Sequence, residues 1–232
     1  MFKFIVRMWY KLTAKKPVTR IIESTEEDKL PQFPTGHKPY TVALICGHTR
    51  KKPNAISYNS KFEFFWNKEV QKFVGEKYKG KIKLVFIDRP DYGYKDSMKY
   101  LANTCASNNV DLAIELHYDA AGVPTAKGGH FRTLKGDSPS YYRAIGFMNG
   151  YLDRFSFASQ RHNGCWRMKR GDAGYYFCYY MEKHGIDSML FEPFFSDYKT
   201  DESEPFLKRD GYKLMAHYWI AELDKLEKNL NL

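Results

Sequence analysis

The fold is decided by residues 111–120, which read DLAIELHYDA. An apolar, strand-forming run leads directly into His117 and Asp119. Short apolar runs of this kind are typical of strands that are buried on both faces of a sheet. Because successive side chains of a strand point to opposite faces, Glu115, His117 and Asp119 are expected on the same side of the sheet. The stretch therefore predicts a buried strand whose carboxyl end carries chemically active groups.

Strand-like and helix-like segments alternate on both sides of this stretch. Further strands are expected at 40–47 (YTVALICG), 81–88 (KIKLVFID), 128–134 (GGHFRTL) and 187–195 (DSMLFEPFF). Helices are expected at 60–78, 96–109 and 139–155, and a closing helix carries Leu207, Leu214, Met215, Tyr218 and Ala221 at helical spacing. This alternation predicts a single α/β domain, with a mostly parallel twisted sheet and helices on both of its faces.

The length and composition suit one domain of 232 residues, of which 43% are hydrophobic and 17% aromatic. Residues 1–39 mix basic, acidic and proline-containing segments, which indicates an N-terminal extension. The regular pattern begins at Tyr40, so the folded domain is expected to span residues 40–232. The four cysteines form no C-x-x-C pair, and buried, reduced thiols are expected.

The net charge of +10 favours anionic partners such as nucleic acid, acidic lipid or polymers of the cell wall. The basic residues are dispersed, and no helix-turn-helix, zinc-finger or RNP pattern is present, so nucleic acid is not the expected partner. No segment is long and apolar enough for stable insertion into a membrane, and no signal peptide is recognisable. We therefore expect synthesis in the cytoplasm.

Polar side chains stand where three of the predicted strands end: His48 after the first, His117 after the central one and Glu192 in the last. Ligands of open α/β sheets gather at this edge. Two imidazoles and one carboxylate with an open position for water make a catalytic zinc site, and a further carboxylate can then move protons. His48 and His117 fit the imidazole positions. Spacing alone leaves Glu63, Glu69 and Glu115 as candidates for the third ligand.

Four motifs, in this order, resemble those of the zinc-dependent N-acetylmuramoyl-L-alanine amidases of type 3, over roughly residues 40–226. They are ICGHTR at 45–50, KFEFFWN at 61–67, YLANTCASNNVDLAIELHYDA at 100–120 and SMLFEPFF at 188–195. The resemblance implies one Zn²⁺ per chain, bound by His48, Glu63 and His117. It also implies that Glu192 is the catalytic acid and base.

The same resemblance implies hydrolysis of the amide between N-acetylmuramic acid and L-alanine in bacterial peptidoglycan. IDRPD with Arg89, GGHF with His130, and Asn67 four residues after Glu63 are smaller similarities. The family usually has a small residue two positions before the second histidine, where this chain has Glu115. We interpret Glu115 as an acceptor for an imidazole N–H, and Asp119 as a further group near the substrate.

Three alternatives to this interpretation remain. A zinc peptidase or another amidohydrolase of related fold would use the same metal chemistry on a different amide. A non-catalytic wall-binding module would lack a ligand or the catalytic carboxylate, and all four are present. A cysteine nucleophile at Cys46 is less favoured, because the residue lies within an apolar run. A phage endolysin that acts on the wall after release fits a single domain without a signal peptide. The sequence gives no indication of oligomeric state.

The tyrosine-rich segment GYYFCYYMEKHG, residues 174–185, has no assigned role in this interpretation. Its rings are expected either to pack in the core or to line a groove.

Overall fold

The computed structural model describes residues 39–123, 125–135, 138–156 and 164–232. The predicted N-terminal extension, residues 1–39, lies outside the described residues except for its last position. Six strands form one sheet in the order β2-β1-β3-β6-β4-β5. They are β1 (Thr41–Cys46), β2 (Lys83–Asp88), β3 (Leu112–Leu116), β4 (His130–Thr133), β5 (Cys165–Arg167) and β6 (Asp187–Glu192).

The sheet is mostly parallel, as predicted. β1 pairs in parallel with both β2 and β3, and β3 pairs in parallel with β6. β4 is antiparallel to β6, and β5 is parallel to β4. The carboxyl ends of β1, β2, β3 and β6 therefore meet at one edge, and β4 begins at that same edge because His130 is paired with Glu192.

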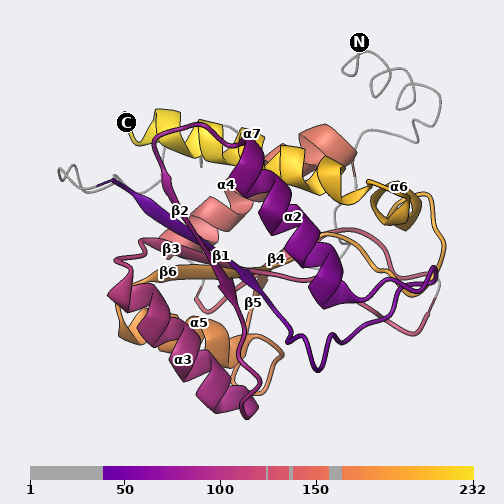
Figure 1. The fold of residues 1–232 in the computed structure, drawn as a ribbon, viewed down its shortest axis with the longest axis horizontal. Coiled ribbons are helices and arrows are strands. Elements are labelled where there is room, and N and C mark those ends of the chain that lie inside the picture. The colour runs from indigo at the N-terminus through magenta and orange to yellow at the C-terminus, as the bar shows by residue number, and fades with distance from the viewer. Residues whose placement is uncertain (1–38, 124, 136–137, 157–163) are drawn as a thin grey trace.

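Helices cover both faces of the sheet, which confirms the predicted α/β class (Figure 1). They are α2 (Glu63–Lys77), α3 (Tyr94–Ser107), α4 (Pro139–Phe155), α5 (Tyr175–Lys183), α6 (Ser203–Leu207) and α7 (Tyr212–Asn229). The alternation of side chains in β1 explains the two layers. Val42 and Leu44 belong to the core beneath α2, α4 and α7, whereas Ala43 and Ile45 belong to the core beneath α3 and α5.

The closing helix differs from its prediction at its start. Leu207 ends the short helix α6, and α7 begins only at Tyr212. Gly211 separates the two helices, and a Cβ at this glycine would lie 2.2 Å from the carbonyl oxygen of Phe206. Asp210, just before this glycine, has a left-handed φ of 66°, which interrupts a right-handed helix. Among the described residues, no helix combines the length and the apolar character needed to cross a membrane.

Candidate metal centre

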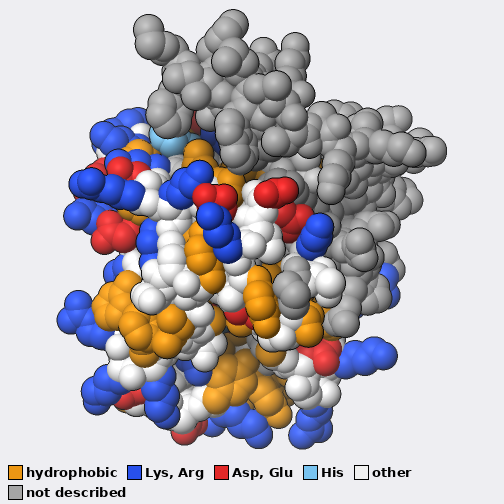
Figure 2. Space-filling model, turned by 90° about the vertical axis from the view of Figure 1, so that its right-hand side faces the viewer, with side chains coloured by type: hydrophobic (Ala, Val, Ile, Leu, Met, Phe, Trp, Pro, Cys, Tyr) orange, Lys and Arg blue, Asp and Glu red, His pale blue; other side chains and the backbone are white. Residues whose placement is uncertain are grey.

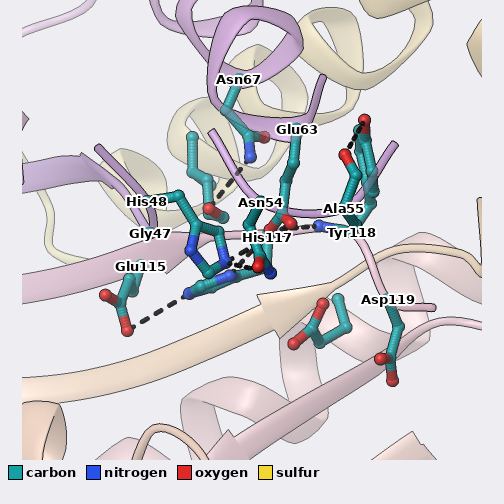
Figure 3. Close-up of polar contacts among 12 residues, drawn as sticks. Gly47, His48, Asn54, Ala55, Glu63, Asn67, Glu115, His117, Tyr118 and Asp119 are labelled. Carbon is teal, nitrogen blue, oxygen red and sulfur yellow. Dashed lines mark hydrogen bonds and ion pairs between the residues drawn. The ribbon is translucent and has the colours of Figure 1, made fainter. Parts of the chain in front are cut away.

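Three side chains from three different segments meet at the carboxyl edge of the sheet (Figure 3). His48 lies two residues beyond β1, Glu63 is the first residue of α2, and His117 directly follows β3. Each offers one ligand atom, and these atoms all lie within 4.8 Å of one another. The two imidazole rings are nearly perpendicular, with centroids 4.8 Å apart. The structure thus brings together the three residues that the sequence nominates as metal ligands.

Glu63 is held at the centre of this group. Its side chain is 1% exposed, and its Oε1 accepts a hydrogen bond from the backbone N–H of Tyr118 at 3.1 Å. Oε1 lies 2.8 Å from Nδ1 of His117, and Oε2 lies 3.4 Å from Nε2 of His48. Burial by itself would raise the pKa of Glu63, but the contacts with His117 and His48 outweigh it and lower the pKa to about 2. Glu63 is therefore a carboxylate at neutral pH.

His117 lies between two carboxylates. Its Nδ1 faces Glu63, and its Nε2 lies 3.4 Å from Oε2 of Glu115. Burial would lower the pKa of His117, but Glu115 above all, together with Glu192 and the hydrogen bond to Glu63, raises it well above its usual value. Without a metal, the ring holds a proton that these carboxylates stabilise. The site is thus suited to a cation.

The donor set fits a zinc ion. Two imidazoles and one carboxylate are common ligands of catalytic zinc. Within the described part of the chain, Oε2 of Glu63 is buried and has no hydrogen-bond partner. Buried polar atoms without partners are rare in folded proteins, and one recognised explanation is an ion bound at that atom. Glu69, an exposed residue of α2, is not part of this group.

Side-chain hydrogen bonds hold the segments that carry the ligands. Arg89 Nη1 donates to the carbonyl oxygen of Gly47 at 2.7 Å, which holds the turn that carries His48. Asn67 Nδ2 donates to the carbonyl oxygen of Leu116 at 3.0 Å and so ties α2 to the end of β3. Asn54, which was not nominated from the sequence, brings Nδ2 within 3.1 Å of Nε2 of His48.

Glu192 ends β6 beside the three ligands and is 7% exposed. Burial raises its pKa to about 8, although the nearby His117 opposes the shift. Asp119 adds to the rise and Arg132 opposes it. In the described structure Oε2 of Glu192 has no hydrogen-bond partner, and Oε1 lies 3.7 Å from Nη2 of Arg132.

A pocket of about 500 Å³ next to Glu192 contains Asp119, His130, Arg132 and Trp166 among its lining residues. Arg132 Nε donates to Nε2 of His130 at 3.0 Å, and Nη2 lies 3.3 Å from Oδ2 of Asp119. The guanidinium carbon of Arg132 also lies over the ring of Trp166, 5.1 Å from its centroid. Asp119 and His130 are therefore neighbours of the metal centre and not part of the ligand group. Arg132 was missed, although it follows His130 by two residues and so lies on the same face of β4.

The family model described as N-acetylmuramoyl-L-alanine amidase matches residues 42–217. A search of curated proteins gave no match. Several solved structures share the fold. An N-acetylmuramoyl-L-alanine amidase from Clostridium difficile 630 has a TM-score of 0.62 and 15% identity, over 81% of this chain and 96% of that chain. The amidase AmiC2 of Nostoc punctiforme has a TM-score of 0.59 and 18% identity, over 83% and 99%.

The catalytic domain of CD27L, an endolysin that targets Clostridia difficile, has a TM-score of 0.55 and 18% identity, over 80% of this chain and 97% of that chain. At such identities the structures establish a common fold. The family model adds sequence similarity over most of the chain, from within β1 into α7. On this ground the chain belongs to the N-acetylmuramoyl-L-alanine amidases, hydrolases that act on peptidoglycan.

Proposed function

We propose that this amidase works with one zinc ion per chain, held by His48, Glu63 and His117, and with Glu192 as its acid and base. The observation that carries the proposal is the convergence of three ligand atoms within 4.8 Å beside a buried carboxyl group. When bound, zinc supplies Lewis acidity, which polarises a carbonyl oxygen and lowers the pKa of water. The remaining steps are assigned to the side chains of this protein.

Glu192 moves the proton of the reaction. Water must lose a proton as it attacks the amide carbonyl, and the amine of L-alanine must gain one as the C–N bond breaks. A carboxyl group whose pKa is raised to about 8 by burial can accept the first proton and deliver the second near neutral pH. Its unpartnered Oε2 is free to contact water or the leaving amine.

Glu115 orients His117. A ligating imidazole commonly donates its other ring N–H to a carboxylate, which fixes the tautomer and the direction of the ring. Glu115 is 2% exposed and has Oε2 at 3.4 Å from Nε2 of His117. With that nitrogen directed to Glu115, Nδ1 of the ring is left to face the metal and Glu63.

Digestion of purified peptidoglycan tests the proposal. Zinc-loaded wild-type protein is compared with chelator-treated protein and with Glu192→Gln, and the products are read by mass spectrometry. We expect free stem peptides that begin with L-alanine, and a loss of rate of about 10²–10⁴-fold in Glu192→Gln, as is usual for a missing acid–base group. Chelator should abolish release, and Glu192→Gln should still bind one zinc per chain.

Glu222→Gln is the matched control. Glu222 is also a buried carboxyl group with a raised pKa, but it lies in α7 and contacts Lys225 at 2.8 Å. We expect this variant to release stem peptides like the wild type. Full activity of Glu192→Gln, or of protein without metal, would contradict the proposed roles. Products cleaved at a different amide would favour a zinc peptidase.

A further inference from the structure

We propose that a tyrosine surface on α3 and α5 binds the glycan strand of peptidoglycan beside the metal centre. The proposal rests on the proposed function, because it assigns the saccharide part of the same substrate. The tyrosine surface consists of Tyr92, Tyr94, Tyr100, Tyr175, Tyr176, Tyr179 and Tyr180. It contains the tyrosines of the 174–185 segment, which the reaction at the metal centre does not use.

Helix α5 divides its side chains between the core and this surface. Phe177, Cys178 and Met181 are buried against the sheet. The tyrosines of α5 are only half-buried and stack along the helix, with centroids 5.8 Å apart for Tyr175 and Tyr179 and 6.2 Å for Tyr176 and Tyr180. Tyr175, Tyr176 and Tyr180 pack partly against the core, but all four rings remain partly exposed, and their exposed parts can contact a ligand.

The surface continues onto α3 and its preceding loop. The centroids of Tyr94 and Tyr176 are 6.1 Å apart, and the backbone N–H of Gly174 donates to the hydroxyl of Tyr94 at 3.2 Å. Tyr92 is 60% exposed and packs edge-on against Tyr100 at 5.8 Å. Tyr94 of α3 thus adjoins the rings of α5, and Tyr92 and Tyr100 form a second pair of rings before and on α3.

Arg89 connects this patch to the metal centre. Its guanidinium lies 5.0 Å from the centroid of Tyr94, while Nη1 donates to the carbonyl oxygen of Gly47, the residue before His48. Burial raises the pKa of Tyr94, and the charge of Glu115 adds to the rise. A glycan strand bound to the tyrosine surface can therefore present its peptide-bearing substituent to the metal centre.

Positive charges border the rings. Lys95 Nζ lies 4.8 Å from the centroid of Tyr176, and Lys183 Nζ lies 4.6 Å from that of Tyr179. Hydrogen bonds with Lys95 and Arg170 lower the pKa of the Tyr176 hydroxyl, so two cations converge on this ring. In Figure 2, orange side chains at the lower end of the molecule, where α3 and α5 lie, are surrounded by blue lysines and arginines.

A glycan strand fits this combination of groups. A pyranose ring has an apolar C–H face that can stack on an aromatic ring and a rim of hydroxyl groups that can bond to tyrosine hydroxyls. Hydrolysis of the amide also leaves a carboxylate on each muramic acid residue, which Lys95 and Arg89 can attract. An uncharged protein partner would not need this border of cations.

The other face of the sheet carries an alternative site. A groove of about 1130 Å³ runs along α2 and is lined by residues that include Phe62, Phe65, Lys61 and Arg209. Phe65 is 44% exposed. Because α2 and α5 cover opposite faces of the sheet, variants of Phe65 and of the tyrosines distinguish the two surfaces.

The test uses the full-length, zinc-loaded protein and peptide-free glycan strands of alternating N-acetylglucosamine and N-acetylmuramic acid. The double variant Tyr176→Ala, Tyr180→Ala is compared with wild type and with Phe65→Ala by calorimetric titration. We expect the Kd of the double variant to rise about tenfold or more, as the loss of two stacking rings implies, and Phe65→Ala to bind like wild type. Lys95→Glu, a change at an exposed residue, should weaken binding while leaving the buried residues of α5 in place.

A second measurement separates this proposal from the proposed function. The double variant is assayed on intact peptidoglycan and on a single N-acetylmuramoyl-L-alanyl peptide. Relative to its kcat/KM on the single peptide, its kcat/KM on peptidoglycan should fall about tenfold, because KM for peptidoglycan rises. Unchanged glycan binding in both the double variant and Lys95→Glu, or a loss confined to Phe65→Ala, would overturn the tyrosine surface. Glycan binding without any release of stem peptide by the wild type would instead refute the proposed function.

Discussion

A methyl group on Gly47 would displace the imidazole of His117. An alanine Cβ at this position would lie 2.0 Å from Cε1 and 2.1 Å from Nε2 of His117. Carbon atoms that are not bonded settle about 3.5–4.0 Å apart, so the ring must move by about 1.5 Å. Glycine at this position therefore serves the close approach of a side chain to the backbone.

The displacement bears directly on the proposed metal site. The ring now holds Nδ1 at 2.8 Å from Oε1 of Glu63. Metal–ligand distances tolerate only about 0.2 Å, so a shift of this size removes His117 from the ligand set. We expect Gly47→Ala to weaken zinc binding by at least about 10–100-fold, the effect of losing a contact that orients a ligand. The free energy of unfolding of the metal-free protein should fall by about 1–3 kcal/mol, as for other overpacked sites.

Competition with a chromophoric zinc chelator measures the affinity, and urea unfolding of metal-free protein measures the stability. Gly146→Ala is the control, because a Cβ at this exposed position of α4 meets no atom within 4 Å. It should bind zinc like the wild type and gain up to about 1 kcal/mol from helix propensity. Wild-type zinc affinity in Gly47→Ala would refute the assignment of His117 as a ligand in this position.

Two further predictions concern buried titratable groups. Burial raises the pKa of Glu192 to about 8 from its usual 4.5, so between these pH values the folded metal-free protein keeps a proton that the unfolded chain releases. Its free energy of unfolding should therefore fall as the pH rises from 5 to 8 relative to Glu192→Gln, and parallel urea-unfolding profiles of the two proteins would contradict this. Burial also raises the pKa of Cys105, Cys165 and Cys178 to about 12, and that of Cys46 further. Iodoacetamide at pH 8 should therefore alkylate these thiols only after the protein unfolds, as mass spectrometry can check, and treatment of the folded protein should leave its activity intact. Alkylation of Cys46 with loss of activity would instead support a cysteine nucleophile.

The central strands could be predicted because burial on both faces makes them continuously apolar. β1 and β3 are fully buried, and their polar neighbours mark the point where each strand leaves the core. β5 has only three residues, too few for any periodicity to appear. α5 was not predicted because its outer positions are tyrosines, so the apolar pattern does not distinguish the buried face from the exposed one.

The candidate site shows the same difference between local and long-range information. His48, His117 and Glu192 stand at strand ends, which the sequence marks, and Glu63 begins a helix that the sequence also marks. Arg132 gains its importance from the antiparallel pairing of β4 with β6, which places His130 opposite Glu192. A basic residue in a short strand gives no local sign of such a pairing, because an edge position in solvent would have the same sequence.

The order of the strands has a consequence for the nascent chain. β3 is a central strand, flanked by β1 from the beginning of the domain and by β6 from near its end. His117 donates its backbone N–H to the carbonyl oxygen of Phe191 at 2.9 Å, so the edge that carries His117 is completed only when β6 has joined the sheet. Such long-range parallel pairing is slow to form. A chain still being made on the ribosome that has not yet reached Glu192 therefore lacks the finished edge, and this edge can be completed only late in folding.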